Sequence, residues 1–352
     1  MDVLTFFLIV AITWLVAFLA LYTRREKLQA RGIILYPFFI LVRKDARAEW
    51  FPKVSKSRVY RALDWVFTGL AYISMGLGFW LVASIVLSKI TSQQTSAALI
   101  PIVPGVTVPL EQTIYILLAL AVAVSLHELM HAMSSTSNGI KVKGGGLLLL
   151  FIFPGAFVEP DEEEFKKAST SKRIKVVASG VAVNLILAFV ALSLLNYLGP
   201  TLSQGALIVN VIKGYPAYNA SIQPGEVIVA VNGHPVRSPD QVDPLLSTTS
   251  PNTVTLLING SLVNKTLITP EGKLGVLLSY YYPYPAVSGF MTFLQWFYII
   301  NFSLATLNAL PLFITDGTKL VSELFRDERR AKTVSLSLSA VTLMLLLMAI
   351  RF

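Results

Sequence analysis

The chain has 352 residues, of which 54% are hydrophobic and 14% charged, and its mean hydropathy is +0.65. The hydrophobic fraction and the mean hydropathy are higher, and the charged fraction is lower, than in ordinary soluble domains, which predicts an α-helical polytopic membrane protein. Since cysteine is absent, disulfides and thiolate metal sites are excluded. The net charge of +9 does not indicate nucleic-acid binding, because the basic residues cluster beside apolar runs, where they set membrane orientation.

The first apolar run, Val3 to Tyr22, has about the 20 residues needed to cross a bilayer. Basic residues follow this run, at Arg24 to Arg31, and none precedes it. A secretory signal peptide has the reverse charge order and a shorter apolar core. The run therefore predicts a permanent membrane helix whose C-terminal end faces the cytoplasm.

The segment from Arg43 to Arg61 is strongly basic and contains Trp50, Phe51 and Pro52. Basic and aromatic residues together are typical of a cytoplasmic loop on the membrane surface, although a solvated linker explains the same composition. A second predicted span, Leu63 to Leu87, follows this loop. The polar and almost uncharged stretch after it, up to Pro109, is typical of an exterior loop.

Four more apolar runs complete a scheme of about six spans: Ile114 to Ser134, Ile174 to Leu198, Phe290 to Leu307 and Val334 to Ile350. In this scheme all the dense basic loops fall on one side of the membrane, which is the pattern of cytoplasmic loops. The sequence therefore predicts an exterior N-terminus and a multi-pass protein, most simply of the cell membrane.

Between the fourth and fifth spans lies a soluble-looking segment, from Gln204 to Pro270. Short β-branched runs alternate there with turn signals such as Asn232-Gly233 and Asn259-Gly260. The pattern predicts a small, mostly β domain outside the cytoplasm. The β runs are Ala206 to Ile212, Val227 to Val231, Thr253 to Ile258 and Leu262 to Ile268. The segment also carries three glycosylation triplets, at Asn219, Asn259 and Asn264.

Two of the chain's three histidines, His127 and His131, lie four residues apart in the third span. On a helix this spacing places both imidazoles on one face, with Glu128 close to it. His-Glu-x-x-His on a helix is the pattern of zinc metalloproteases, in which the histidines bind the metal and the glutamate transfers protons. A chance match with hydrogen-bonded histidines is the alternative, but ionisable residues inside a membrane span usually mark a functional site.

A catalytic zinc ion takes three protein ligands and leaves one position for water. The third histidine, His234, falls in the exterior β domain, so a carboxylate must complete the set. Asp316 is the only acid between Phe290 and Gly317, and it is the leading candidate. The alternative is that Asp316 caps a cytoplasmic helix beginning at Gly317. Pro311 and Gly317 should break the helix, which is tolerated at membrane depth only beside protein or a water cavity.

With these motifs the chain resembles the site-2 protease family of intramembrane zinc metalloproteases. The resemblance covers about Glu111 to Lys332 and leaves the first two spans outside the shared core. It rests on His127-Glu128-Leu129-Met130-His131, on Gly180-Val181-Ala182-Val183-Asn184, and on Asn308-Ala309-Leu310-Pro311 with Asp316-Gly317. It implies a single zinc ion held by two histidines and an aspartate, and Gly180, Pro311 and Gly317 as structural residues at the site.

The β segment resembles a PDZ domain, which members of this family often carry at this place. The matching residues are Gly214 to Ala217, Ile222 to Ile228 and Val231 to Gly233. The chain is thus expected to comprise a two-span region at 1–110, a first part of the membrane core at 111–199, a PDZ-like exterior domain at 200–285 and a second part of the core at 286–352. The PDZ-like domain would either bind a substrate C-terminus or exclude bulky exterior domains.

The glycine-flanked run from Gly144 to Val158 is too short for a span. The residues alone allow a re-entrant loop or a hairpin, and the family resemblance favours a membrane-dipping β-hairpin. Its segment from Phe151 to Phe157 is expected to offer an edge for pairing with an unwound substrate helix. The acidic stretch that follows, Glu159 to Glu164, is expected to be a solvated cytoplasmic face.

The family resemblance implies that the substrate is a membrane-tethered regulator, released into the cytoplasm after a first exterior cut. Asn184 and Asn308 are expected to bond to its backbone or to the developing oxyanion, although hydrogen bonding between helices is an alternative role. Two other functions stay open: an inactive membrane scaffold, or a metal or ion transporter. A transporter needs polar residues at successive depths, whereas these residues gather at one depth.

Overall fold

The computed structural model describes residues 3–45, 55, 57–91, 98–269 and 271–350. The chain forms two compact units, one of Met1–Val190 with Trp296–Phe352 and the other of Ala191–Gln295. The boundary passes through two long helices, so the second unit contains the β segment together with the adjoining helix ends. The expected aromatic loop at Trp50, Phe51 and Pro52 lies outside the described residues, as does the start of the polar stretch after the second span.

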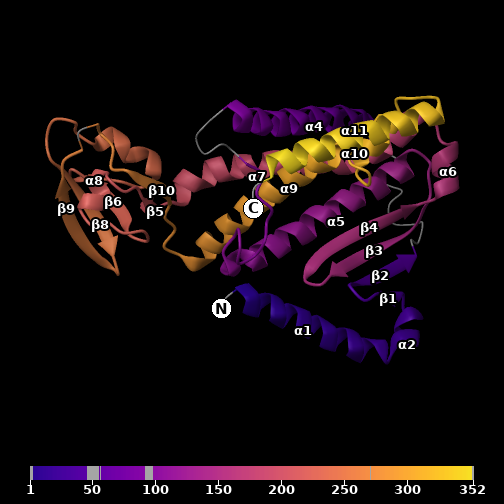
Figure 1. Cartoon of the computed structure of the whole chain (residues 1–352), viewed down its shortest axis with the longest axis horizontal. Helices are drawn as coiled ribbons and strands as arrows, with labels where there is room; N and C mark the ends of the chain where they lie inside the picture. The colour runs from indigo at the N-terminus through magenta and orange to yellow at the C-terminus, as the bar shows by residue number, and fades with distance from the viewer. Residues whose placement is uncertain (1–2, 46–54, 56, 92–97, 270, 351–352) are drawn as a thin grey trace. The chain divides into compact units, whose positions relative to one another are not determined.

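Six helices in the described ranges are long and apolar enough to cross a membrane. Two of them have 34 and 33 residues, longer than the predicted spans, because residues on both sides of each apolar run are helical as well. The candidate spans, coloured along the chain in Figure 1, are α1 (Val3–Tyr22), α4 (Arg58–Thr91), α5 (Thr113–Ser137), α7 (Thr170–Leu202), α9 (Pro285–Ala309) and α11 (Glu328–Ala349).

The first unit also contains an antiparallel sheet in the order β1-β2-β3-β4. The expected hairpin is present as β3 (Val142–Leu150) and β4 (Phe153–Pro160), and β4 packs against α5 (Figure 1). Two strands from the N-terminal region, β1 (Ile33–Leu35) and β2 (Phe39–Asp45), extend it, after the short helix α2 (Arg25–Gln29). The beginning of the predicted basic loop is therefore a strand and not a loop.

Three successive glycines in β3, Gly144 to Gly146, let side chains on the flanking strands meet across it. The Arg43 guanidinium on β2 lies 2.8 Å from a carboxylate oxygen of Glu159 on β4, Nη2 to Oε2. A Cβ atom at Gly144 would lie 3.2 Å from that oxygen and 3.3 Å from Arg43 Nη2. Glu159 is thus paired within the sheet, which corrects the expectation that it belongs to a solvated face.

The rest of the acidic stretch includes the first turn of a short helix, α6 (Glu162–Lys167), where the Glu162 and Glu163 side chains are 84% and 82% exposed, as predicted for a solvated face. The Asp161 carboxylate caps this helix by accepting hydrogen bonds from the backbone N–H groups of Glu163 and Glu164. It also lies 3.1 Å from the Lys143 ammonium. The Glu164 N–H and the Lys143 charge together hold the pKa of Asp161 below its usual value.

The second unit is built on a sheet in the order β10-β5-β6-β8-β9, with β7 paired to β6. The four predicted β runs correspond to β5 (Ala206–Val211), β6 (Val227–Val231), β8 (Asn252–Ile258) and β9 (Ser261–Leu267); the additional elements are α8 (Pro216–Asn219), β7 (His234–Pro235) and β10 (Val276–Tyr280). Two hairpins turn at Asn232-Gly233 and Asn259-Gly260, where all four residues have positive φ. Asn-Gly is the residue pair that such turns favour.

Candidate metal centre and active site

The two motif histidines lie together on one face of α5. The Nε2 atoms of His127 and His131 are 3.1 Å apart, and the imidazole ring centroids are 4.7 Å apart. This arrangement follows from the spacing of four residues, because successive helical turns place such side chains above one another. His234, by contrast, is exposed on β7 in the second unit, as expected from its place in the β segment.

Asp316 approaches the same two nitrogen atoms. Its Oδ2 atom lies 3.1 Å from His127 Nε2 and 3.2 Å from His131 Nε2, and the residue is 7% exposed. Asp316 is the first residue of a short helix, α10 (Asp316–Ser322), whose N-cap residue is Thr315. The alternative role of Asp316 as a helix cap is therefore not what the structure contains.

A break in the chain after α9 lets Asp316 reach the histidines. The helix α9 ends at Ala309, and the following residues, which include Pro311, are not helical until α10 begins. A Cβ atom at Gly317 would collide with the carbonyl group of Ala309. Only glycine allows this close approach of the two helix ends, which fixes the position of the neighbouring Asp316.

A second glycine makes room for the imidazoles. Gly180 lies on α7, and a Cβ atom there would be 2.5 Å from His131 Nε2 and 2.8 Å from His127 Cε1. The expected structural role of Gly180 thus has a steric basis, because any side chain at this position would displace both rings.

Neighbouring groups orient the ligand atoms. His131 Nδ1 lies 2.7 Å from the carbonyl oxygen of Val176. Because a carbonyl can only accept, Nδ1 carries the proton and the lone pair of Nε2 points toward Asp316. Lys319, which the sequence did not single out, lies 3.3 Å from Asp316 Oδ1 and leaves Oδ2 to face the histidines.

These three groups fit a metal ion. Three atoms that bind tetrahedral zinc at about 2.0–2.2 Å stand about 3.3–3.5 Å apart, close to the 3.1–3.2 Å measured between the two Nε2 atoms and Oδ2. Lys319 pairs with one oxygen of the Asp316 carboxylate, and the other oxygen faces the two imidazole nitrogens, so three donor atoms face one another at a point where a cation could bind. Among the described residues, His127, His131 and Asp316 form the group that could hold a metal.

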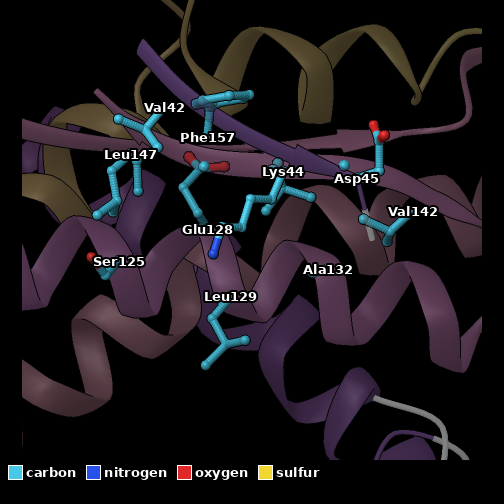
Figure 2. Close-up of a pocket in the computed structure, with 15 residues that line it drawn as sticks. Val42, Lys44, Asp45, Ser125, Glu128, Leu129, Ala132, Val142, Leu147 and Phe157 are labelled. Atoms are coloured by element: carbon cyan, nitrogen blue, oxygen red, sulfur yellow. The ribbon is translucent and has the colours of Figure 1, made fainter. Parts of the chain in front are cut away.

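Glu128 lies between two cavities beside these residues. A cavity of about 930 Å³ separates α5 from the sheet, and a second of about 350 Å³ is lined by His131, Asp316 and Lys319. Only Glu128 and Val158 line both of them. Figure 2 shows the Glu128 side chain rising from α5 toward Phe157 in the larger cavity.

Residues 115–349 match the family model of Peptidase family M50. The chain belongs to this family. It is 30% identical over 330 residues to the "Uncharacterized protein MJ0971" of Methanocaldococcus jannaschii, an alignment that covers 90% of this chain and 84% of that protein. It is also 29% identical over 194 residues to the "Membrane-bound transcription factor site-2 protease homolog" of Arabidopsis thaliana, covering 50% of this chain and 37% of that protein.

The M50 peptidases are zinc metallopeptidases, which agrees with the ligand geometry. The matched residues include both histidines, Glu128 and Asp316, whereas β1, β2 and α4 lie before them. Six candidate spans and membership of a membrane-protease family make this an integral, multi-pass membrane protein.

The two asparagines predicted to bind the substrate, Asn184 and Asn308, lie on α7 and α9. Asn184, one helical turn beyond Gly180 on α7, is completely buried, and neither atom of its amide has a partner in the described part of the chain. Asn308, near the end of α9, is half-buried. The buried amide of Asn184 is therefore available to a group that is not part of this chain.

The two phenylalanines expected to form the substrate edge have different positions. Phe157 lies on β4 and lines the larger cavity (Figure 2). Phe151 is in the turn between β3 and β4, with a φ of 53°, and its ring lies 5.3 Å from that of Trp14. The expectation that Phe151 belongs to the edge is wrong, because the strand begins only at Phe153.

Sequence reasoning also missed an ion pair that links two elements of the site. Arg173 at the start of α7 binds the carboxylate of Glu323 through two nitrogens, Nε to Oε1 at 2.7 Å and Nη2 to Oε2 at 2.6 Å. Glu323 follows the last turn of α10, the helix that begins with Asp316. The pair thereby fixes α10 against α7. No local signal reveals it, since the partners are 150 residues apart.

Proposed function

We propose that this protein is an intramembrane zinc metalloprotease that hydrolyses peptide bonds within or near the transmembrane helices of membrane-tethered proteins. The observation that carries the proposal is the meeting of two imidazoles and one carboxylate within 3.2 Å, beside Glu128 on a candidate membrane span. A zinc ion held there by His127, His131 and Asp316 supplies Lewis acidity, which polarises a carbonyl group and acidifies water.

Glu128 is the proposed general base. It takes the proton of the attacking water and transfers it to the leaving amine. Its place between the two cavities supports this role, because it can meet water from one side and a peptide from the other. The smaller cavity has charged walls, including Lys166 and Lys319, and admits water; the larger has mostly apolar walls and accepts the substrate.

The substrate must unwind before it can react. In a helix each carbonyl oxygen is hydrogen-bonded to an N–H four residues on, and breaking these bonds inside a membrane is costly unless they are replaced. Strand addition replaces them. Among the described strands β4 is paired only with β3, so the other edge of β4 lacks a strand partner. We place the substrate on this edge, from Phe153 to Phe157.

Asn184 is the proposed ligand of the substrate backbone or of the developing oxyanion. A buried amide without partners costs free energy, about 1–3 kcal/mol for each unsatisfied group, and an incoming carbonyl oxygen would remove part of that cost. Asn308 is assigned the same function on α9. An amide donor directed at the oxyanion stabilises the transition state more than the substrate.

The second unit is proposed to be a PDZ-like domain on the exterior side, with the N-terminus also outside and the active site toward the cytoplasm. Its sheet and its two Asn-Gly hairpins support this assignment. It would screen the substrate, a membrane-tethered regulator already cut once outside. Deleting 200–285 separates the two roles: cleavage of uncut substrates would indicate exclusion, and poor cleavage of trimmed substrates would indicate recruitment.

Cleavage of a membrane-anchored reporter by the purified full chain tests the function. We expect the wild type to cut the reporter helix, a zinc chelator to stop cleavage, and added zinc to restore it. An inactive scaffold would cut nothing even when loaded with zinc. A transporter would move metal into sealed vesicles and leave the reporter intact. Either result would contradict the proposal.

A further inference from the structure

A buried acid on α4 has no role in the chemistry proposed above. Asp64 is 1% exposed, within a helix that is a candidate membrane span. A carboxylate at such a position is costly and is retained where it binds a partner or has a function. The helix lies outside residues 115–349, which match the M50 family, and neither α1 nor α4 has an assigned function.

Both oxygens of Asp64 bind the metal-bearing helix α5. Ser134 Oγ donates to Oδ1 at 2.9 Å, and Asn138 Nδ2 donates to Oδ2 at 2.9 Å. Ser134 is completely buried. Both bonds are made to a buried carboxyl group at 2.9 Å, and hydrogen bonds are directional. Asp64 therefore holds the C-terminal part of α5 in a defined orientation.

The residues that Asp64 binds lie on the same face of α5 as the imidazoles. His127, His131, Ser134 and Asn138 follow one another at steps of four, three and four residues. At 3.6 residues per turn, these four positions fall within an arc of about 60°. A bond to Ser134 and Asn138 thus fixes the direction in which both histidines point.

Rotation of α5 about its axis has a large effect at the metal. The imidazole Nε2 atoms lie about 6–7 Å from the helix axis, so a rotation of about 10° moves them by about 1 Å. Metal–ligand distances tolerate only about 0.2 Å. Apolar contacts also join α4 and α5, since Met130 and Met133 pack against a cluster that includes Tyr60 and Phe67. Such contacts are not directional and permit small rotations.

We propose that Asp64 is a positioning residue for the metal site, which sets the rotation of α5 and thereby the direction of His127 and His131. In this proposal the helix α4 helps to hold the metal ligands in position. The inference rests on the proposed zinc site. It predicts a change in zinc affinity, which can be measured without an assay of cleavage.

Exchange of the hydrogen-bonding roles tests the inference. Asp64→Leu keeps the branched shape of the side chain but removes both acceptors, and in Asn138→Asp two carboxylates face each other. The double variant, Asp64→Asn with Asn138→Asp, restores a donor facing an acceptor. Zinc affinity of the full chain in detergent or nanodiscs, measured by competition with a chelator, should fall about 10- to 100-fold in each single variant and recover most of this loss in the double variant.

A loss of zinc affinity could also come from a general loss of stability. The midpoint of thermal unfolding of the metal-free protein, measured for each variant and for a control variant on α4, distinguishes this effect from a change in the position of the histidines. Lys89 on α4 donates to three carbonyl oxygens at the end of α11, at 3.0–3.1 Å, and does not bind α5. Lys89→Met should lower thermal stability but leave zinc affinity unchanged. If Asp64→Leu does not fold, Ser134→Ala removes one of the two bonds and should weaken zinc binding by a smaller factor.

Three results would overturn the inference. Asp64→Leu, or Ser134→Ala where Asp64→Leu does not fold, could bind zinc as tightly as the wild type. Lys89→Met could weaken zinc binding as much as Asp64→Leu. The double variant could stay as weak as the single variants. A wild-type chain that binds no zinc at all would instead remove the metal site itself, and the proposed function with it.

Discussion

Glu128→Gln should leave zinc binding intact and reduce cleavage of a membrane-anchored reporter by about 10²- to 10⁴-fold, the usual contribution of a general base. The substitution keeps the size of the side chain and removes only its ability to take a proton. Glu128 has no place among the three metal ligands, so the bound zinc should not change. The measurement is zinc content and initial cleavage rate on the same preparation.

Two further variants serve as controls for this result. His131→Ala removes a metal ligand and should lose both zinc and cleavage. Glu162→Gln makes the same chemical change at an 84% exposed side chain that lines the smaller cavity, and it should cleave normally. If Glu128→Gln still cuts the reporter at the wild-type rate, another group is the base.

Gly180→Ala should weaken zinc binding by about 10²-fold or more although it removes no ligand. The new Cβ atom would lie 2.5 Å from His131 Nε2, so the rings must move by a substantial part of an ångström. Metal–ligand distances tolerate only about 0.2 Å, and even changes in the groups that support the ligands cost about 10- to 100-fold in metal affinity. In a helix interior, alanine is itself more stable than glycine by about 0.5–1 kcal/mol. Zinc affinity should therefore fall without loss of helix stability.

Gly76→Ala is the matched control for this effect. Gly76 lies in the interior of α4, and a Cβ atom there would meet nothing within 4 Å. The same substitution should leave zinc affinity unchanged. Equal zinc affinity in Gly180→Ala and the wild type would show that α7 does not limit the position of the imidazoles.

Much of the membrane architecture could be predicted, because apolar runs indicate the membrane spans and basic residues indicate the cytoplasmic loops. The N-terminal strands β1 and β2 could not be predicted. β2 pairs with β3 through contacts such as Val42 with Leu147, about a hundred residues away in the chain, and no local pattern contains that partner. The turn at Phe151 could not be predicted either, because this residue takes a positive φ, which is uncommon for a residue with a side chain.

The candidate metal ligands could be predicted because their signals are local. The helical spacing of His127 and His131 and the isolation of Asp316 in an apolar run are visible in the residues alone. The supporting groups have no such signal. Asp64 and Arg173 acquire their roles from partners 70 and 150 residues away, so only the folded chain identifies them.

Metal analysis of the purified wild type beside Asp316→Ala tests the central claim most directly. The wild type should contain about one zinc ion per chain, bound by two histidine nitrogens and a carboxylate oxygen. Asp316→Ala should lose more than about 100-fold in zinc affinity, because even outer partners of a zinc site contribute 10- to 100-fold. A wild type without zinc, or an Asp316→Ala variant that binds zinc as tightly as the wild type, would contradict the account.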